Sequence, residues 1–133
     1  MPRREIFRLF RSNKYLGKGG ESSNGVDLIE SNGCNDWCNI SFSNTGKIEN
    51  LKFDHRGCLI SRASINALLE AISNKTISEA KAILLNYKSM IMGDSYEFLS
   101  EELLLFKKIA KYSSRRSCLL VGCNFLIKRL DES

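Results

Sequence analysis

The spacing of apolar residues changes near residue 58, and this change constrains the fold more than any other feature of the chain. Upstream, three segments alternate apolar with polar residues, as half-buried strands do. They cover residues 26–31, 38–42 and 47–53. Downstream, apolar residues recur at helical spacing in four segments. These cover residues 58–74, 76–92, 100–112 and 114–130. Strands followed by helices predict an α+β domain, here a three-stranded antiparallel sheet with helices packed on one face.

Local signals refine the predicted sheet. The polar run at 43–46, "SNTG", predicts the turn between the second and third strands. Within the third strand the apolar positions change parity between Ile48 and Leu51, which indicates a bulge or a twist there.

Capping signals mark the starts of two predicted helices. Thr76 is followed three residues later by Glu79, the pattern of a capping box. Ser100 is a candidate cap for the helix after it. In the last helix Val121 and Gly122 lower the helix propensity, but the apolar spacing continues through them.

The start of the chain, "MPRREIFRLFR", is rich in arginine and lacks the continuous apolar stretch of a signal peptide. A mitochondrial presequence would share the arginines. Ile6, Phe7, Leu9 and Phe10 fall on one helical face, so we predict a short helix over 3–12 that docks on the domain. Residues 13–25 are rich in glycine, serine and asparagine and predict a loop.

The composition fits one domain over residues 1–133, with 43% apolar and 26% charged residues. No apolar run approaches the ~20 residues that cross a bilayer, so we expect a cytoplasmic protein without a membrane partner. The net charge of +5 comes from scattered Lys and Arg residues that do not interleave with aromatic residues. This pattern predicts a solvated surface and no nucleic-acid partner. Five cysteines, an odd number, favour packing, metal or redox chemistry over disulfides.

Geometry limits which cysteines can share a site. On an extended strand Cys34 and Cys38 would stand roughly 13 Å apart. On a helix Cys118 and Cys123 would point about 140° away from each other. Each pair therefore supplies at most one ligand to a small site.

The remaining positions can meet because they fall at the ends of predicted elements. Cys34 lies in a turn, and Cys58 and Cys118 each open a predicted helix, where the helix N-terminus favours a thiolate. Asp36 adds an oxygen ligand near Cys34. Three thiolates and one carboxylate complete a tetrahedral metal site. Buried single cysteines that only fill packing positions fit the same pattern, so the residues alone leave both readings open.

Three segments resemble the signature of the IscU/SufU family, the NifU N-terminal-like iron–sulfur assembly proteins. They are "GCND" at 33–36, "RGCLISRAS" at 56–64 and "RRSC" at 115–118. The family has a Cys-Gly-Asp motif before a strand, a Gly-Cys-x-Ile-Ser-x-Ala-Ser segment at a helix start, and a third Cys after basic residues. Asn35 replaces the glycine of the first motif, and asparagine tolerates the same left-handed turn.

The resemblance is strongest to the SufU branch. Ser117 stands where the IscU branch has a histidine, and the only proline, Pro2, excludes the Leu-Pro-Pro-Val-Lys segment that Hsp70-type chaperones recognise. Sixty positions separate Cys58 from Cys118, as in SufU proteins with an inserted stretch, which we place at about 93–113.

The resemblance implies that Cys34, Asp36, Cys58 and Cys118 hold either a nascent 2Fe–2S cluster or Zn²⁺. Cys34 would accept sulfur from a SufS-like cysteine desulfurase, and downstream iron–sulfur proteins would receive the product. Such a protein is a scaffold or sulfur-transfer partner rather than a free-standing enzyme. The competing function is a small basic nucleic-acid-binding module stabilised by zinc.

Three further residues have no role in the family pattern. Cys38 and Cys123 fit small apolar fillers of a strand and a helix. His55, the only histidine, lies three residues before Cys58 and is either a surface residue or a substitute ligand.

Overall fold

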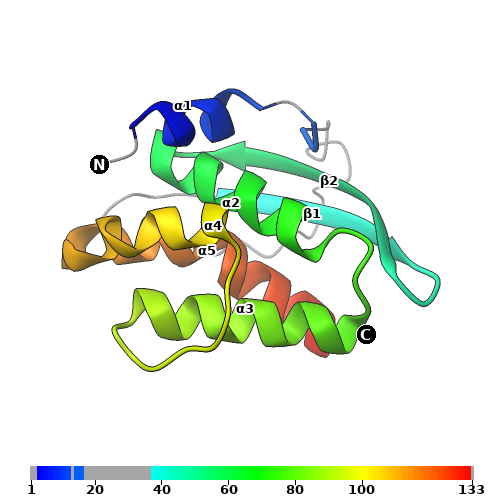
Figure 1. The fold of residues 1–133 in the computed structure, drawn as a ribbon. Coiled ribbons are helices and arrows are strands. Elements are labelled where there is room, and N and C mark those ends of the chain that lie inside the picture. The colour runs from blue at the N-terminus through cyan, green and yellow to red at the C-terminus, as the bar shows by residue number, and fades with distance from the viewer. Residues whose placement is uncertain (1–2, 13, 17–36, 133) are drawn as a thin grey trace.

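The computed structural model describes residues 3–12, 14–16 and 37–132, and it has the predicted α+β architecture (Figure 1). Its helices and strands are, in order, α1 (Arg3–Arg11), β1 (Trp37–Asn44), β2 (Ile48–Arg56), α2 (Leu59–Ile72), α3 (Ile77–Ile91), α4 (Glu101–Leu104), η2 (Leu105–Lys107), η3 (Ile109–Lys111) and α5 (Ser113–Asp131). The predicted strand over 26–31 lies outside the described residues. In the described ranges no helix has the length and apolar character needed to span a membrane.

Strands β1 and β2 form an antiparallel hairpin, with Trp37 opposite Arg56 at its open end. The predicted turn is confirmed, and Gly46 in it has a φ of +102° that glycine adopts without strain. On one face of the hairpin, Ile40 and Phe53 pair and are buried. This face carries the sheet's share of the core.

The predicted bulge is confirmed. Between the Ser41–Lys52 and Ser43–Glu49 pairs the register advances two residues in β1 but three in β2. The additional residue in β2 is accommodated by Asn50, whose φ of +56° is in the left-handed region. Ile48 and Leu51 can therefore both face the core although their spacing breaks the alternation.

The segment after α1 runs along the outer edge of β2. The Phe53 N–H donates to the Tyr15 carbonyl at 2.8 Å, and Leu16 forms a parallel bridge with Phe53. This short contact pairs backbone groups of β2 that a two-stranded hairpin would leave exposed.

Helix α1 docks on the domain, as predicted, and it packs on α2. One of its four predicted contact residues faces outward. Ile6 and Leu9 are buried, whereas Phe7 is 45% exposed. The Asn66 amide of α2 donates to the Leu9 carbonyl at 2.6 Å and thereby caps the end of α1. Asn66 is itself buried, so α1 is fixed by a polar contact as well as by packing.

Helix α3 begins with the predicted capping box. The Thr76 hydroxyl accepts from the Glu79 N–H at 3.2 Å, and the Glu79 carboxylate accepts from the Thr76 N–H at 3.0 Å. Two N–H groups that the first turn leaves unpaired are thus satisfied.

The predicted helix over 100–112 is wrong beyond its first turn. Ser100 caps α4 as predicted, accepting from the Leu103 N–H at 3.4 Å, but the chain then tightens into η2 and η3. The buried residues Leu103, Phe106 and Ile109 recur every three positions. A period of three is that of a 3₁₀-helix, so burying all three on one side favours the tighter coil.

Candidate metal and thiol site

Two of the four predicted ligands, Cys58 and Cys118, lie in the described part of the chain. Cys34 and Asp36 lie outside it, so the predicted convergence of all four stays a prediction. Among residues 3–12, 14–16 and 37–132, no three side chains of His, Cys, Asp or Glu are grouped so that they could hold a metal ion.

Cys58 occupies the predicted position at the start of α2. It is the N-cap residue, with extended backbone at φ −83° and ψ 168°, and its thiol makes no capping hydrogen bond to the helix. Gly57 before it has a φ of +152°, which lets the chain turn sharply from β2 into α2. The half-buried thiol thus lies at the helix end that attracts anions.

Ser61 connects Cys58 to His55. The Ser61 hydroxyl donates to the Cys58 carbonyl at 3.0 Å and contacts His55 Nε2 at 2.6 Å. Because the hydroxyl proton is used on the carbonyl, His55 Nε2 must carry the proton of the second bond. This nitrogen is therefore not available as a metal ligand while the bond holds.

Cys118 departs from its predicted position. Helix α5 begins at Ser113, so Cys118 lies in the second turn and does not open the helix. The N–H groups left unpaired at a helix start belong to its first turn, so Cys118 gains less from the helix end than Cys58 does. The side chain of Cys118 is also fully buried.

A buried polar contact fixes α5 on α2 and α3 next to Cys118. The hydroxyls of Ser64 and Tyr87 both lie 3.0 Å from the Leu119 carbonyl and 2.8 Å from each other. Burial raises the pKa of Tyr87 far above its usual range, so the phenol stays protonated. Sequence analysis used Ser64 only as part of a family motif and missed this role. The position of this serine on an otherwise apolar helix face could have indicated a buried hydrogen bond.

Cys38 and Cys123 are packing residues, as predicted. Both are fully buried. The Cys38 thiol donates to the Val121 carbonyl at 3.8 Å, and the Cys123 thiol donates to the Leu84 carbonyl at 3.3 Å. Burial raises the pKa of Cys123 to about 12, which keeps this sulfur protonated and unsuited to binding metal.

The elements that carry Cys58 and Cys118 start at the same end of the sheet. In Figure 1, β1 begins, β2 ends, and α2 and α5 begin on the left, and both helices then run to the right. Two close contacts hold this arrangement: the bond from Cys38 to Val121, and a glycine in α5, Gly122, packed against Ile65 of α2. A Cβ on Gly122 would lie 2.6 Å from Ile65 Cγ1, so only glycine fits without a shift.

Known proteins share both the sequence and the fold. The sequence profile of the NifU-like N-terminal domain matches residues 2–118. The chain is 28% identical, over 114 residues, to the iron–sulfur cluster assembly scaffold protein IscU of Streptococcus pyogenes serotype M1, covering 82% of this chain and 72% of that protein. The IscU scaffold protein of Thermotoga maritima is 27% identical over 88 residues, which cover 65% of this chain and 62% of that protein.

A solved structure agrees with these matches. The crystal structure assigned to the iron–sulfur cluster assembly scaffold of the SUF system from Fervidobacterium islandicum AW-1 superposes with a TM-score of 0.77 at 28% identity. The match covers 92% of this chain and 90% of that one. The chain therefore belongs to the family of NifU-like N-terminal domains, the family of the IscU and SufU proteins that its cysteine motifs resemble.

Proposed function

We propose that this chain is a scaffold for iron–sulfur cluster assembly and that Cys34, Asp36, Cys58 and Cys118 bind the growing cluster. The observation that carries the proposal is the placement of Cys58, in a chain of this family, as the half-buried N-cap residue of α2, whose thiol does not cap the N–H groups of the first turn. A buried N-cap polar group normally satisfies the helix. The Cys58 thiol instead contacts the Ser61 hydroxyl at 3.8 Å.

The chemistry of the donors fits iron and zinc. Thiolates are the ligands of iron–sulfur clusters and of structural zinc, and two of the proposed thiols come from elements packed together. Cys58 stands at the start of α2, and Cys118 precedes Leu119, whose carbonyl is bonded to Ser64 of α2. Zinc bound at these residues would supply a stable tetrahedral centre in place of a cluster.

The order of the chain supports adding Cys34 and Asp36 to the set. Trp37 pairs with Arg56, two residues before Cys58, so the chain enters β1 beside the start of α2. Cys34 is three residues before Trp37, and three residues span at most ~11 Å. That reach is sufficient for a shared site at this end of the sheet.

The proposed ligands have different roles. Cys34 accepts sulfur from a SufS-like cysteine desulfurase, and Asp36 is the weaker oxygen ligand through which the cluster leaves for an acceptor protein. Cys58 and Cys118 hold the metal from packed helices. The absence of a chaperone-recognition segment leads us to expect transfer that an Hsp70-type chaperone does not stimulate.

The test is cluster assembly from ferrous iron, cysteine and a desulfurase under anaerobic conditions. Iron, acid-labile sulfide, zinc and protein-bound persulfide are measured for the natural chain and for Cys34→Ser, Cys58→Ser, Cys118→Ser and Asp36→Ala. We expect each cysteine change to abolish stable cluster, Cys34→Ser to abolish the persulfide, and Asp36→Ala to slow cluster release.

Cys123→Ala is the matched control, because this thiol lies on the same helix as Cys118 but is bonded to the Leu84 carbonyl. It should leave cluster content unchanged. Cluster formation in Cys58→Ser or Cys118→Ser equal to that of the natural chain would refute the ligand set. Persulfide on the Cys34→Ser variant would refute the assignment of the sulfur acceptor.

A further inference from the structure

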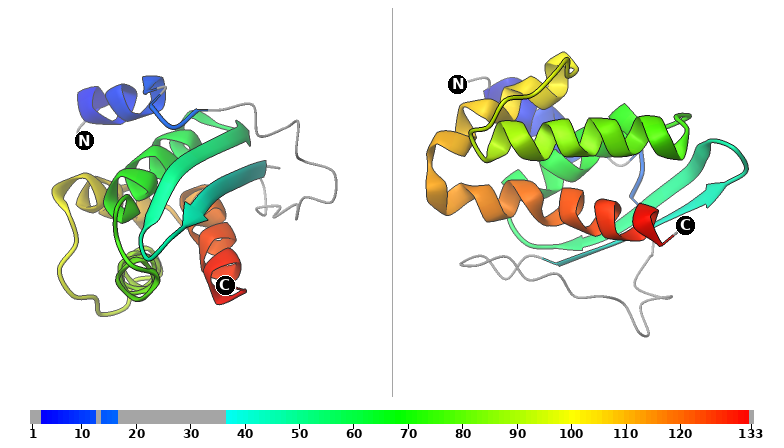
Figure 2. Two further views of the ribbon diagram at one scale, coloured as in Figure 1. Left: turned by 90° about the vertical axis from the view of Figure 1, so that its right-hand side faces the viewer. Right: turned by 90° about the horizontal axis from the view of Figure 1, so that it is seen from below.

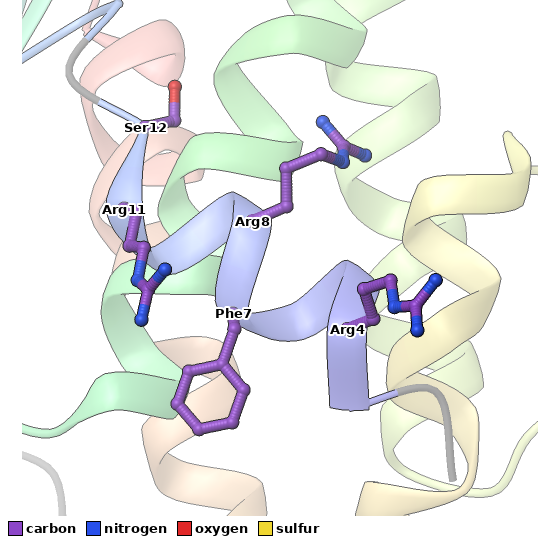
Figure 3. Close-up of a pocket in the computed structure, with 5 residues that line it drawn as sticks. All are labelled: Arg4, Phe7, Arg8, Arg11 and Ser12. Atoms are coloured by element: carbon purple, nitrogen blue, oxygen red, sulfur yellow. The ribbon is translucent and has the colours of Figure 1, made fainter.

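Helix α1 has a basic outer face with an aromatic ring at its centre. Its inner side is buried through Ile6 and Leu9, but Phe7 is 45% exposed. Figure 3 shows Phe7 extending from the middle of the helix with Arg4, Arg8 and Arg11 along the same element, and these four residues line one surface pocket. A large exposed ring surrounded by guanidinium groups is a feature of binding surfaces rather than of an ordinary solvated face.

The stretch that runs from the end of α3 into the first turn of α4 has the opposite character. Residues 94–102, "DSYEFLSEE", hold four acidic residues and no Lys or Arg. At their centre Phe98 is 92% exposed, more than any other large apolar side chain in the described ranges. Near the middle of this stretch, the Lys107 ammonium donates to the Tyr96 hydroxyl at 2.9 Å.

The exposure of Phe98 is enforced by its neighbours. The Glu97 N–H donates to the Asn86 side chain of α3 at 2.8 Å, and Leu99 is buried in the core. With the residues on either side fixed, the Phe98 ring is directed outward. Exposing an apolar ring to water costs free energy, which is recovered when another surface covers the ring.

The two faces are neighbours on the surface. Arg8 of α1 forms an ion pair with Glu102 of α4 at 2.7 Å, so the basic face adjoins the C-terminal end of the acidic stretch. The left panel of Figure 2 shows α1, α4 and the stretch that follows α3 on the same side of the molecule.

We propose that this side of the molecule binds a second copy of the chain in a two-fold symmetric dimer. The basic face of each copy (Arg4, Phe7 and Arg11) contacts the acidic stretch (94–102) of the other. With a two-fold axis near the Arg8–Glu102 pair, the same contact between a basic face and an acidic stretch forms twice, once on each side of the axis. This is the arrangement of an isologous interface. A foreign acidic partner would cover only the basic face and leave Phe98 in water.

The proposal does not depend on the function proposed above. Its test is sedimentation velocity of the full chain over a concentration series, with a reductant and a chelator so that neither disulfides nor metals join the copies. Two charge-reversed variants are compared: Arg4→Glu/Arg11→Glu and Glu97→Lys/Glu101→Lys. We expect a dimer for the natural chain and a dissociation constant at least about tenfold weaker for each variant alone.

Mixing the two variants decides between this interface and any other. In a mixed pair the reversed basic face of one copy meets the reversed acidic stretch of the other, so opposite charges again oppose each other at both contacts. The equimolar mixture should therefore regain the dimer that neither variant forms alone. Lys47→Glu/Lys52→Glu on the hairpin makes the same change in net charge as the α1 variant and should leave the dimer intact.

Phe98→Ser provides a second measurement that does not alter charge, and it should weaken the dimer by about tenfold or more. Circular dichroism of each variant establishes that the domain remains folded. A natural chain that stays monomeric at every concentration would overturn the proposal. So would a dimer that both reversed variants retain, or a mixture of the two that stays monomeric.

Discussion

Cys58 and Cys118 belong to the same family signature, yet the fold treats their thiols in opposite ways. Cys58 precedes the first turn of α2 and is half-buried, and its thiol contacts the Ser61 hydroxyl at 3.8 Å without capping the helix N–H groups. Cys118 lies one turn inside α5 and is fully buried. One side chain is therefore partly exposed to solvent, whereas the other is fully enclosed by the core.

The difference follows from how each helix starts. Gly57, with its φ of +152°, forces a sharp turn, so α2 cannot begin before Cys58. At α5 the N-cap residue is Tyr112, which makes no side-chain capping bond, and the helix extends back past Arg115 and Arg116. Two segments of one family signature thus place their cysteines differently, Cys58 at a helix end and Cys118 inside a helix.

The largest expected effect is on thiol reactivity. In chelator-treated, reduced protein we expect iodoacetamide to alkylate Cys58 roughly 100-fold faster than Cys118. A buried thiol reacts only after local opening, and an opening that costs about 3 kcal/mol slows it by about that factor. Mass spectrometry of the cysteine peptides over time measures both rates in one sample.

Cys38 and Cys123 serve as internal standards for that experiment, because both are fully buried and bonded to backbone carbonyls. They should react as slowly as Cys118. Equal rates at Cys58 and Cys118 would mean that α5 starts later in solution than the structure shows.

The second prediction concerns stability without metal. Cys118→Ser places a hydroxyl in the core and should lower the free energy of unfolding by about 1–3 kcal/mol. Cys58→Ser should raise it by about 0.5–1 kcal/mol, because serine is a preferred N-cap and its oxygen can accept from the first turn of α2. Urea denaturation of the two variants and the natural chain, with chelator and reductant present, gives both values.

Changes of opposite sign in the free energy of unfolding would confirm that Cys58 and Cys118 contribute differently to stability. Losses of equal size would show that Cys58 is also a packing residue. With zinc added, the natural chain should gain stability that neither variant gains, since each has lost a proposed ligand.

Local rules predicted much of the fold. The capping box at Thr76 and Glu79 depends on groups three residues apart, so the sequence states it directly. The bulge at Asn50 was visible as a parity change, because both of the apolar positions around it must face one core. These features are decided by neighbours in the chain.

Features decided by distant neighbours were missed. The 3₁₀ turns after α4 arise because Leu103, Phe106 and Ile109 must all face the same side of the core. Gly122 was read as a weak point of α5, whereas its lack of a Cβ is what allows contact with Ile65. The outward position of Phe7 depends on where α1 docks on α2. No spacing rule within one segment contains that information.

The smallest expected effect lies in the C-terminal half of α2, away from Cys58. The Glu70 carboxylate accepts hydrogen bonds from the Tyr15 hydroxyl and, at 3.0 Å, from the Lys14 ammonium. These bonds lower the pKa of Glu70, the Tyr15 bond having the larger effect. A lowered carboxyl pKa stabilises the fold above the ordinary pKa of 4.5, and this contribution is lost as the pH falls through the lowered value.

Glu70→Gln should therefore lower the free energy of unfolding at pH 7 by less than about 1 kcal/mol, because the side chain is partly exposed and its charge is screened. The difference from the natural chain should shrink as the pH falls below the ordinary carboxyl pKa of 4.5 and through the lowered value, because the natural carboxylate then becomes protonated. Urea denaturation at pH 7 and pH 3 measures this change. The alkylation rate of Cys58 in the variant should equal that of the natural chain. An accelerated rate would mean that the contact of Lys14 and Tyr15 with α2 also controls access to the thiol. The contrast with Cys118 would then depend on this contact and not on the helix starts alone.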